Sequence, residues 1–436
     1  MGIETAPWAM TIEARTIRKL RVRILPFVFL LFVVAFLDRI NIGFAALTMN
    51  KELAITSQQY GLLFGIFFLG YFLFEIPSNL LLHKIGARVW IARILISWGM
   101  VAMLTGLVHT AHQLYIARFL LGLAEAGYFP GIALYLTYWF PQREQARALA
   151  FLMAAIPITT ILGAPVSGLI LDHVHWLGVS SWRWLLVLEG IPAIVGGFLT
   201  YFLLPGRPKE AKFLSAKEKD WIQEELGREE QQKLEQHRYS VLQALASGRV
   251  WHLVFIYFSL MIGQYTLQSW TPQLVKSLSS IYSNSFVGYL VTIPNLAGLA
   301  AMIWVSRSSD RKLERRYHVA IPAIAAAGAF VLLGATRSPL YSVTLLCLLA
   351  AGIYSCTGPF WALPNEFLTG FSAAAGIALI NSFGNLGGFA GPYMMGAVTT
   401  RMGSPYAGLA IAGVSLFVSA TLVLLLPKKA RATAQG

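Results

Sequence analysis

The chain has 436 residues, of which 56% are hydrophobic and only 12% charged, and 34 Lys and Arg against 20 Asp and Glu give a net charge of +14. Soluble globular proteins carry roughly twice this share of charged residues, and a single soluble core stops growing near ~300 residues, so a soluble globular protein is excluded. The same composition excludes disordered, collagen-like and disulfide-stapled chains, and the long apolar runs exclude an outer-membrane barrel. An all-α, polytopic membrane protein remains.

Apolar windows of about 20 residues, the length that crosses a bilayer core, occur twelve times along the chain. The predicted spans are 24–47, 57–82, 89–109, 113–138, 146–171, 183–204, 250–276, 284–305, 318–336, 340–363, 373–398 and 404–426. The first span follows basic residues but is long and lacks a small-residue cleavage site. We therefore expect it to stay in the mature protein rather than act as a removable signal.

Basic residues are distributed unevenly between the two sides of these spans. Most of the 34 Lys and Arg lie before the first span, in the central hydrophilic stretch, in alternate short loops and in the tail. The opposite loops hold Lys51, Arg183, Lys276, Arg337 and Arg401. An excess of basic residues marks the cytoplasmic side, so we expect a multi-pass protein of the cell inner (plasma) membrane with both termini in the cytoplasm. Nucleic-acid binding is not expected, because no basic domain lies outside the spans.

One long hydrophilic stretch, 206–248, divides the twelve spans into two sets of six. Its segment 214–226 has the apolar spacing of a helix, which predicts a cytoplasmic linker with an amphipathic helix. The predicted organisation is a cytoplasmic N-terminal segment 1–23, a six-helix bundle 24–205, the linker 206–248, a second six-helix bundle 249–427 and a cytoplasmic tail 428–436.

The two halves resemble each other at a nearly constant spacing. Segments 77–88, 127–130 and 162–168 of the first half are followed by similar segments about 227 to 231 positions later. A repeat of six and six spans is typical of transporters, whose binding site lies between the repeats near the middle of the membrane.

Longer motifs carry a family resemblance. They are FLDRINIGFA (36–45), EIPSN (75–79), GARVWIARILISWG (86–99), RFLLGLAEAGYFPG (118–131), FWALP (360–364) and INSFGNLGGFAGP (380–392). With these motifs the chain resembles the major facilitator superfamily and, within it, the anion:cation symporter family. The resemblance implies two pseudo-symmetric six-helix bundles and proton-coupled uptake, by alternating access, of a small organic anion such as a sugar acid, a dicarboxylate such as tartrate, or an aromatic acid such as phthalate.

The loop after the second span departs from the superfamily's usual motif, because His83 stands where that motif has Asp. The second-half copy keeps Asp310 and Arg311, and the first-half loop keeps Arg88. We expect these residues to take part in gating, with Glu75 holding the inner gate of the first half in place of the missing Asp.

Four ionisable residues lie near the middle of predicted spans: Asp38, Arg39, Arg118 and Glu125. Each costs roughly 2.5–3.5 kcal/mol on insertion scales, so each indicates a functional site. At 1.5 Å per residue, Asp38 and Arg118 lie at compatible depths and so, more loosely, do Arg39 and Glu125. Since Asp38 and Arg39 point about 100° apart, we expect Asp38 to meet Arg118 and Arg39 to face a central cavity, where a guanidinium can bind a carboxylate through two hydrogen bonds.

Glu125 has no partner of opposite sign on its own turn, and burial favours the neutral form of a carboxylic acid, so we expect it to bind and release a proton. The resemblance assigns protons to the residues matching Asp38 and Glu125, and the substrate or the proton relay to those matching Arg39 and Arg118. The alternatives are static ion pairs that fix helix packing, for both Asp38–Arg118 and Arg39, and a permanently protonated Glu125.

The second half contributes neutral polar and aromatic residues instead of charges. Asn381 and Asn385 share one helix face, and the resemblance to sugar-acid transporters places Asn381 in the substrate site. Further candidate substrate residues are Tyr71, Tyr257, Tyr265, Gln268, Asn295 and Trp361. For the aromatic residues, packing against lipid is an equally good interpretation. The glutamine that sugar-acid relatives carry in the fifth span aligns with Ile156, which favours a less hydroxylated or more apolar acid.

Several functions stay open beside proton-coupled symport. They are a proton-coupled drug antiporter of the same fold, a membrane sensor that binds an anion without moving it, and coupling to sodium instead of protons. An enzyme is not expected, since no nucleophile–base pair is evident, and neither a metal site nor a cofactor is predicted. The expected partners are the organic anion, the proton and the lipid bilayer, with the protein acting as a monomer.

Overall fold

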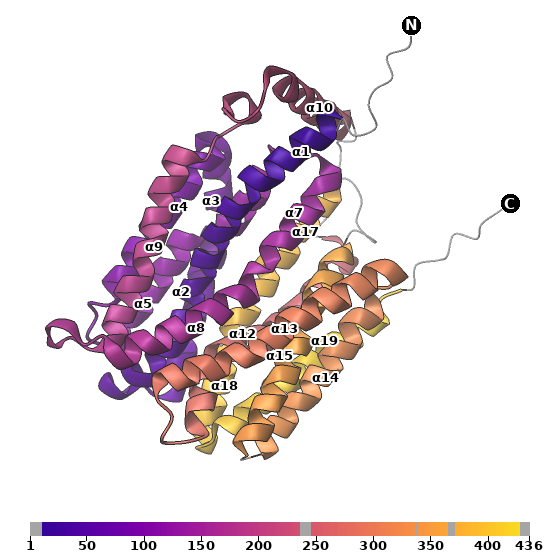
Figure 1. The fold of residues 1–436 in the computed structure, drawn as a ribbon. Helices are drawn as coiled ribbons and strands as arrows, with labels where there is room; N and C mark the ends of the chain where they lie inside the picture. Colours follow the sequence, from indigo (N-terminus) through magenta and orange to yellow (C-terminus); the bar gives the residue numbers. More distant parts are fainter. Residues whose placement is uncertain (1–10, 236–245, 337, 365–370, 428–436) are drawn as a thin grey trace, which may run out of the picture.

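A computed structural model describes residues 11–235, 246–336, 338–364 and 371–427. The first half contains α1 (Ile12–Arg23), α2 (Leu25–Glu52), α3 (Ser57–Ile85), α4 (Ala87–Thr105), α5 (Ala111–Glu125), α6 (Tyr128–Thr137), α7 (Gln142–Met153), α8 (Ala155–His173) and α9 (Ser181–Leu203). After α10 (Ala216–Glu235), the second half contains α12 (Gly248–Ser277), α13 (Asn284–Lys312), α14 (Arg316–Ala335), α15 (Pro339–Ala362), α17 (Phe371–Asn385), α18 (Gly387–Met402) and α19 (Pro405–Leu425). Figure 1 shows the two sets of helices as two bundles side by side.

The predicted spans correspond to these helices. Within the described ranges, eleven helical segments are long and apolar enough to cross a membrane. The remaining predicted span, 373–398, is formed by α17 and α18, which meet at Leu386 and are 15 and 16 residues long. The all-α architecture with two six-helix bundles is therefore confirmed. Among the residues described, three of its spans consist of two consecutive helices: α5–α6, α7–α8 and α17–α18.

The break between α5 and α6 is caused by Gly127. This residue has φ +84°, a left-handed conformation that other residues adopt only under strain, and a Cβ there would collide with the Ser78 hydroxyl. The Ser78 hydroxyl instead donates a 2.6 Å hydrogen bond to the carbonyl of Ala126. The break leaves Glu125 as the last residue of α5, and broken helices of this kind line the sites of many transporters.

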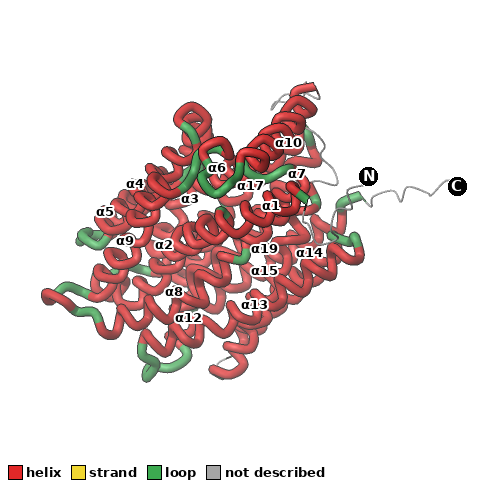
Figure 2. The backbone as a smooth tube through the Cα atoms, turned by 45° about the horizontal axis from the view of Figure 1, so that its top comes forward, coloured by secondary structure: helices red, strands yellow, loops and turns green. Residues whose placement is uncertain are grey.

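The start of α1, the end of α19 and α10 lie toward one face of the molecule, which we call the terminal face, and the opposite face is the distal face (Figure 1). Figure 2, turned by 45°, shows that helices joined by loops make up the described chain. At the terminal face, α1, α7 and α10 are tied together by ion pairs, such as Lys19 to Glu218 at 2.8 Å and Arg143 to Glu225 at 2.7 Å.

The two bundles pack tightly toward the distal face, through α8 against α13 and α3 against α18. A Cβ on Gly288 would collide with the carbonyl of Ala164, and one on Gly61 with the carbonyl of Pro392. Small residues let helix backbones approach closely in membranes, and here they bring the two halves together.

Hydrogen bonds reinforce this distal contact. The carboxylate of Asp172, at the end of α8, accepts bonds of 2.7–3.1 Å from the backbone N–H groups and the side chains of Asn284 and Ser285 at the start of α13. Tyr60 donates a 2.7 Å bond from α3 to the carbonyl of Ser269 on α12. The structure is therefore closed at its distal face.

Candidate functional site

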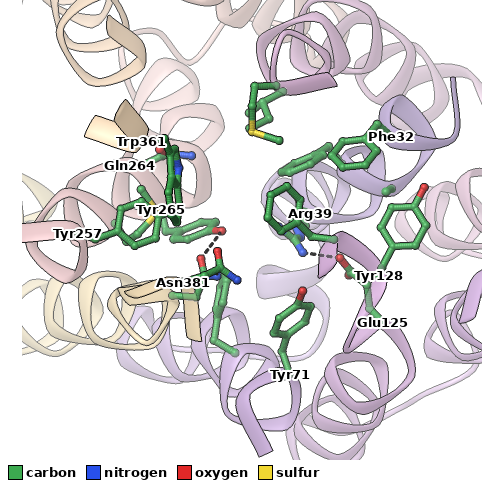
Figure 3. Close-up of a pocket in the computed structure, with 18 residues that line it drawn as sticks. Phe32, Arg39, Tyr71, Glu125, Tyr128, Tyr257, Gln264, Tyr265, Trp361 and Asn381 are labelled. Carbon is green, nitrogen blue, oxygen red and sulfur yellow. Dashed lines mark hydrogen bonds and ion pairs between the residues drawn. The ribbon is translucent and has the colours of Figure 1, made fainter. Parts of the chain in front are cut away.

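A pocket lies between the two bundles, with an empty volume of about 680 Å³ that includes space open to solvent. Figure 3 shows its residues facing one another from both halves. The predicted residues that line it are Arg39, Tyr71, Glu125, Tyr257, Tyr265, Trp361, Asn381 and Asn385. Ile156, the position where sugar-acid relatives carry glutamine, lines it as well.

On the first-half side, the guanidinium of Arg39 forms an ion pair with Glu125 (Figure 3). Only 1% of the Glu125 side chain and 13% of the Arg39 side chain are exposed. The guanidinium carbon lies 4.8 Å from the ring centre of Phe36 and 5.8 Å from that of Tyr71, so aromatic faces surround the cation. Arg39 Nε and Glu125 Oε2 have no hydrogen-bond partner among the described residues. The pair thus retains unused donor and acceptor capacity beside an open pocket.

The expected ion pair between Asp38 and Arg118 is wrong for this conformation: in the described part of the chain, Asp38 makes no ion pair within 4 Å. Its carboxylate instead accepts 2.8 Å hydrogen bonds from the Trp98 indole on α4 and from the Asn41 amide. Asp38 turns into its own bundle, away from the pocket, because it lies one residue from Arg39 and therefore about 100° around the helix.

Arg118 is buried with its guanidinium carbon 5.1 Å from the ring centre of Phe67. It interacts electrostatically with both Asp38 and Glu125. Its Nε atom is without a hydrogen-bond partner in the ranges that the structure covers. A cation so placed stabilises negative charge on either carboxyl group without being tied to one of them.

On the second-half side, neutral side chains form a chain of hydrogen bonds. Tyr265 donates to Asn385 (3.4 Å), Asn385 donates to Asn381 (3.2 Å), and Asn381 donates to Glu75 of the first half (3.1 Å). The ring centres of Tyr257 and Trp361 are 4.9 Å apart, and the two rings form an apolar wall beside these hydrogen-bonded side chains. These groups offer amides and hydroxyls to a polar ligand opposite Arg39.

Glycines in α17 and α18 make this arrangement compatible with close helix packing. A Cβ on Gly384 would collide with the ring of Tyr257, and a Cβ on Gly388 with the ring of Phe68. Because Gly384 has no side chain, the Tyr257 ring can pack against α17. The absence of a side chain at Gly388 likewise allows α18 to approach α3.

Two predicted substrate residues lie elsewhere. Gln268 and Asn295 line a second, smaller pocket, together with Tyr354, whose hydroxyl donates a 3.0 Å bond to Asn295. Gln268 lies about one helical turn beyond Tyr265 toward the distal face, and Asn295 belongs to α13, which contributes nothing to the central pocket. Gln268 is therefore separated from the residues around Arg39 by its depth, and Asn295 by the helix to which it belongs.

Of the predicted gating residues, Glu75 contacts the other half, through Asn381 and through a 2.7 Å bond from the Ser382 hydroxyl. Arg88 pairs with Glu210 after α9 at 3.4 Å. Asp310 pairs with Arg315 of its own half at 2.6 Å, and Arg311 is exposed beside it. The structure does not describe the side chain of His83.

Sequence reasoning missed other residues. Gln264, Tyr128 and Met261 line the pocket, and Gln264 could have been found as a polar residue directly before Tyr265. Glu189 on α9 is an acidic residue inside a predicted span and is only 4% exposed. The membrane cost that singled out Asp38 applies to it equally. Within the described ranges, no group of three or more His, Cys, Asp or Glu could hold a metal ion.

Comparisons with known proteins agree with this fold. The sequence profile described as the Major Facilitator Superfamily matches residues 28–392. The chain is 44% identical over 419 residues to an Agrobacterium vitis protein named "Putative tartrate transporter", with 96% of each chain covered. It is 38% identical over 400 residues to the "Quinolone resistance transporter" of Acinetobacter baumannii, with 92% of each covered.

Among solved structures, a bacterial homolog of the human lysosomal transporter Spinster, in an inward-facing and occupied conformation, superposes with a TM-score of 0.72. The two sequences are 17% identical, and the match covers 93% of this chain and 96% of the other. The similarity establishes the fold, and the family match establishes a multi-pass membrane transporter rather than an enzyme. The chain belongs to the major facilitator superfamily.

Proposed function

We propose that the protein imports a small organic carboxylate together with protons across a bacterial inner membrane, by alternating access. The observation that carries the proposal is the ion pair of Arg39 with Glu125 at the wall of the central pocket. In this scheme the terminal face is cytoplasmic, as the distribution of basic residues predicts.

Coupling follows from competition for one guanidinium. Ionised Glu125 occupies Arg39, and a substrate carboxylate needs the same donors. When Glu125 takes up a proton it no longer attracts the cation, so Arg39 is free to bind the substrate. Proton and anion then favour each other's binding, which is the linkage that symport requires.

The remaining pocket residues support a carboxylate with few hydroxyl groups. Asn381, Asn385 and Tyr265 supply neutral donors and acceptors for a second carboxyl or a hydroxyl group. Ile156 and Trp361 make other parts of the wall apolar. A tartrate-sized dicarboxylate or a small aromatic acid suits this composition, and the name of the Agrobacterium vitis relative agrees with the first of these.

The two faces offer the contacts that alternating access must make and break. The distal face is held by the bonds of Asp172 to Asn284 and Ser285. Toward the terminal face, Glu75 bonds to α17 next to the pocket. The structure holds both contacts at once, and in the proposed cycle each one breaks when the pocket opens toward its face of the molecule.

A drug/proton antiporter is the second candidate, favoured by the printed name of the Acinetobacter baumannii relative. Adding substrate outside would make the medium more alkaline in symport and more acidic in antiport. Sodium coupling predicts loss of uptake in sodium-free buffer, and a sensor predicts binding without uptake.

The deciding experiment uses the purified protein. A thermal-shift screen against sugar acids, dicarboxylates and aromatic acids identifies the ligand, and uptake of that ligand is measured in liposomes with an imposed pH gradient. We expect uptake driven by an acidic outside medium. Accumulation that is independent of the pH gradient and of the membrane potential would overturn proton symport.

A further inference from the structure

A second group of buried polar side chains lies inside the first bundle, behind the pocket wall. It consists of Asp38 and Asn41 on α2, Ser167 on α8 and Glu189 on α9. None of the four lines the central pocket, and all are less than 9% exposed. Buried carboxyl groups in a membrane are costly, so two of them together require an explanation.

The two carboxyl groups have unequal hydrogen-bond partners. Both carboxylate oxygens of Asp38 accept a 2.8 Å hydrogen bond from an N–H group, one from Asn41 and one from Trp98. Glu189 accepts one hydrogen bond, of 2.7 Å, from the Ser167 hydroxyl to its Oε1 atom. This difference favours ionised Asp38, since a carboxylate with more donors holds its charge more easily.

Two buried acceptor atoms of this group of side chains are left without partners. Glu189 Oε2 and the Asn41 carbonyl oxygen Oδ1 are both buried and have no hydrogen-bond partner among the described residues. The Asn41 side chain interacts with Glu189 as well as with Asp38. Two acceptors cannot bond to each other, but a proton on Glu189 Oε2 would donate to Asn41 Oδ1 and satisfy both.

The charges around Glu189 also favour a proton there. Asp38, from α2, is the ionisable group that interacts with it electrostatically, and it is an acid. From α8, Ser167 contributes a hydroxyl, and Trp98 of α4 donates to Asp38. Arg118 interacts with Asp38, whereas the groups that act on Glu189 include no basic residue in the part of the chain that is described. Two interacting carboxyl groups resist ionising together, and the donors at Asp38 favour its ionised form and leave the proton to Glu189.

We propose that Glu189 is a further protonatable residue of the transport cycle, which holds a proton in this distally closed conformation and links Asp38 to α8. The link to α8 is Ser167, which precedes Gly168, where a Cβ would collide with the Asn284 carbonyl of α13. Protonation at Asp38 and Glu189 is thereby connected to the helix that closes the distal face. The coupling role rests on the proton symport proposed above, whereas the protonation of Glu189 does not.

The first test reads the proton directly. Infrared spectra of the purified protein at neutral pH should contain the carbonyl stretch of a buried, protonated carboxylic acid. Glu189→Gln should remove that band, while its amide donates to Asn41 and accepts from Ser167 and so preserves the packing. Glu52→Gln is the matched control, since Glu52 lies at the distal end of the same bundle and pairs with Arg183. An unchanged band in Glu189→Gln would overturn the proposal.

The second test concerns transport. In liposomes, Glu189→Gln should lower the number of protons moved per substrate and flatten the pH dependence of uptake, whereas Glu52→Gln should behave as wild type. If the wild type moves substrate without protons, symport fails while the infrared result still decides the protonation of Glu189. A coupled wild type with a fully coupled Glu189→Gln would reject the transport role alone.

Should Glu189→Gln not fold, Ser167→Ala keeps the carboxyl group and removes its hydroxyl donor. The infrared band should then titrate with a shifted midpoint. An unshifted midpoint would show that the band belongs to another acid and would overturn the proposal.

Discussion

Arg39 of α2 and Glu125 of α5 form an ion pair at the wall of the central pocket, although they are 86 positions apart in the chain. Breaking a buried pair by removing one partner leaves an uncompensated charge, which is strongly destabilising unless a ligand or a proton compensates it. In the proposed cycle, substrate compensates Arg39 and a proton compensates Glu125. Substituting Arg39 and Glu125 one at a time separates these roles.

Arg39→Lys should weaken substrate binding by about 2 kcal/mol or more, roughly 30-fold, because an ammonium group cannot reproduce the two parallel bonds of a guanidinium to a carboxylate. Titration of the thermal shift with the identified ligand measures this loss. Arg93→Lys is the control, since Arg93 packs over Trp90 on α4 and does not line the pocket. Equal losses in both variants would argue against a role for Arg39 in binding.

Glu125→Gln should abolish accumulation driven by a pH gradient while counterflow exchange of the substrate continues. The amide cannot ionise, so it neither carries a proton nor competes for Arg39 in its charged form. Radiolabelled uptake and counterflow in the same liposomes give the two rates, with Glu52→Gln as the comparison. Intact acid-driven uptake in Glu125→Gln would remove this residue from proton coupling and leave anion binding at Arg39 unaffected.

The sequence is sufficient to place Arg39 of α2 and Glu125 of α5 at compatible positions along their helices, and the structure pairs them, because charges stand out in apolar runs and the helix rise converts position into depth. It could not predict how each helix is rotated against its neighbours. Depth alone therefore pairs Asp38 with Arg118, whereas in the structure Asp38 accepts a hydrogen bond from Trp98 of α4. Glu189 lies in the predicted span 183–204, so the insertion cost indicates it as it does Asp38, but its contact with Ser167 of α8 follows only from helix packing.

The interruption of helices within a span could not be predicted from the sequence either. The apolar pattern predicts the segment 118–131 as part of one span, 113–138, but Gly127 adopts a left-handed conformation, and α5 ends at Glu125. Apolar composition sets where a chain crosses the membrane, whereas single backbone dihedrals set where a helix is interrupted. The break exposes backbone groups of the fourth span, which Ser78 satisfies from α3.

The Asp172 contact predicts how strongly the distal face is held. Asp172→Ala removes the acceptor of four hydrogen bonds from Asn284 and Ser285, and bonds to a charged group contribute about 1.5–3 kcal/mol each. We expect distal opening to become at least tenfold more frequent. Thr271 lines the second, smaller pocket, beside Gln268 and Asn295. The rate of thiol labelling of a cysteine placed at this position, in a background without Cys347 and Cys356, measures distal opening.

Glu224→Ala serves as the control for this variant, because the Glu224 side chain is 76% exposed and pairs with Arg228 of its own helix, α10. It should label at the wild-type rate. A labelling rate in Asp172→Ala no higher than in the control would mean that helix packing alone keeps the distal face closed.

The attachment of α1 to α10 should depend on pH through Glu218. Burial disfavours its charge, but hydrogen bonds from Lys19 and Ser215 outweigh that effect and hold the pKa of Glu218 below its usual range. Because the folded-state pKa is lowered, the stabilisation is complete above the unfolded-state pKa of about 4.3 and is lost as pH falls through the lower, folded value. Limited proteolysis of the linker should accelerate below about pH 4 in the wild type, and Glu218→Gln should be cleaved faster already at neutral pH. Equal cleavage of both proteins at neutral pH would contradict the attachment.

Two glycines in comparable helices offer a matched test of the close distal contact. Gly61→Ala places a methyl group against the backbone of Pro392, which cannot yield as a side chain would, whereas Gly328→Ala on α14 places the same group in open space. We expect Gly61→Ala to prevent the distally closed state and to lower uptake at least tenfold, since overpacking costs about 1–3 kcal/mol. Gly328→Ala should transport normally, because it gains only helix propensity. Normal uptake in Gly61→Ala would mean that α3 and α18 need not approach this closely during transport.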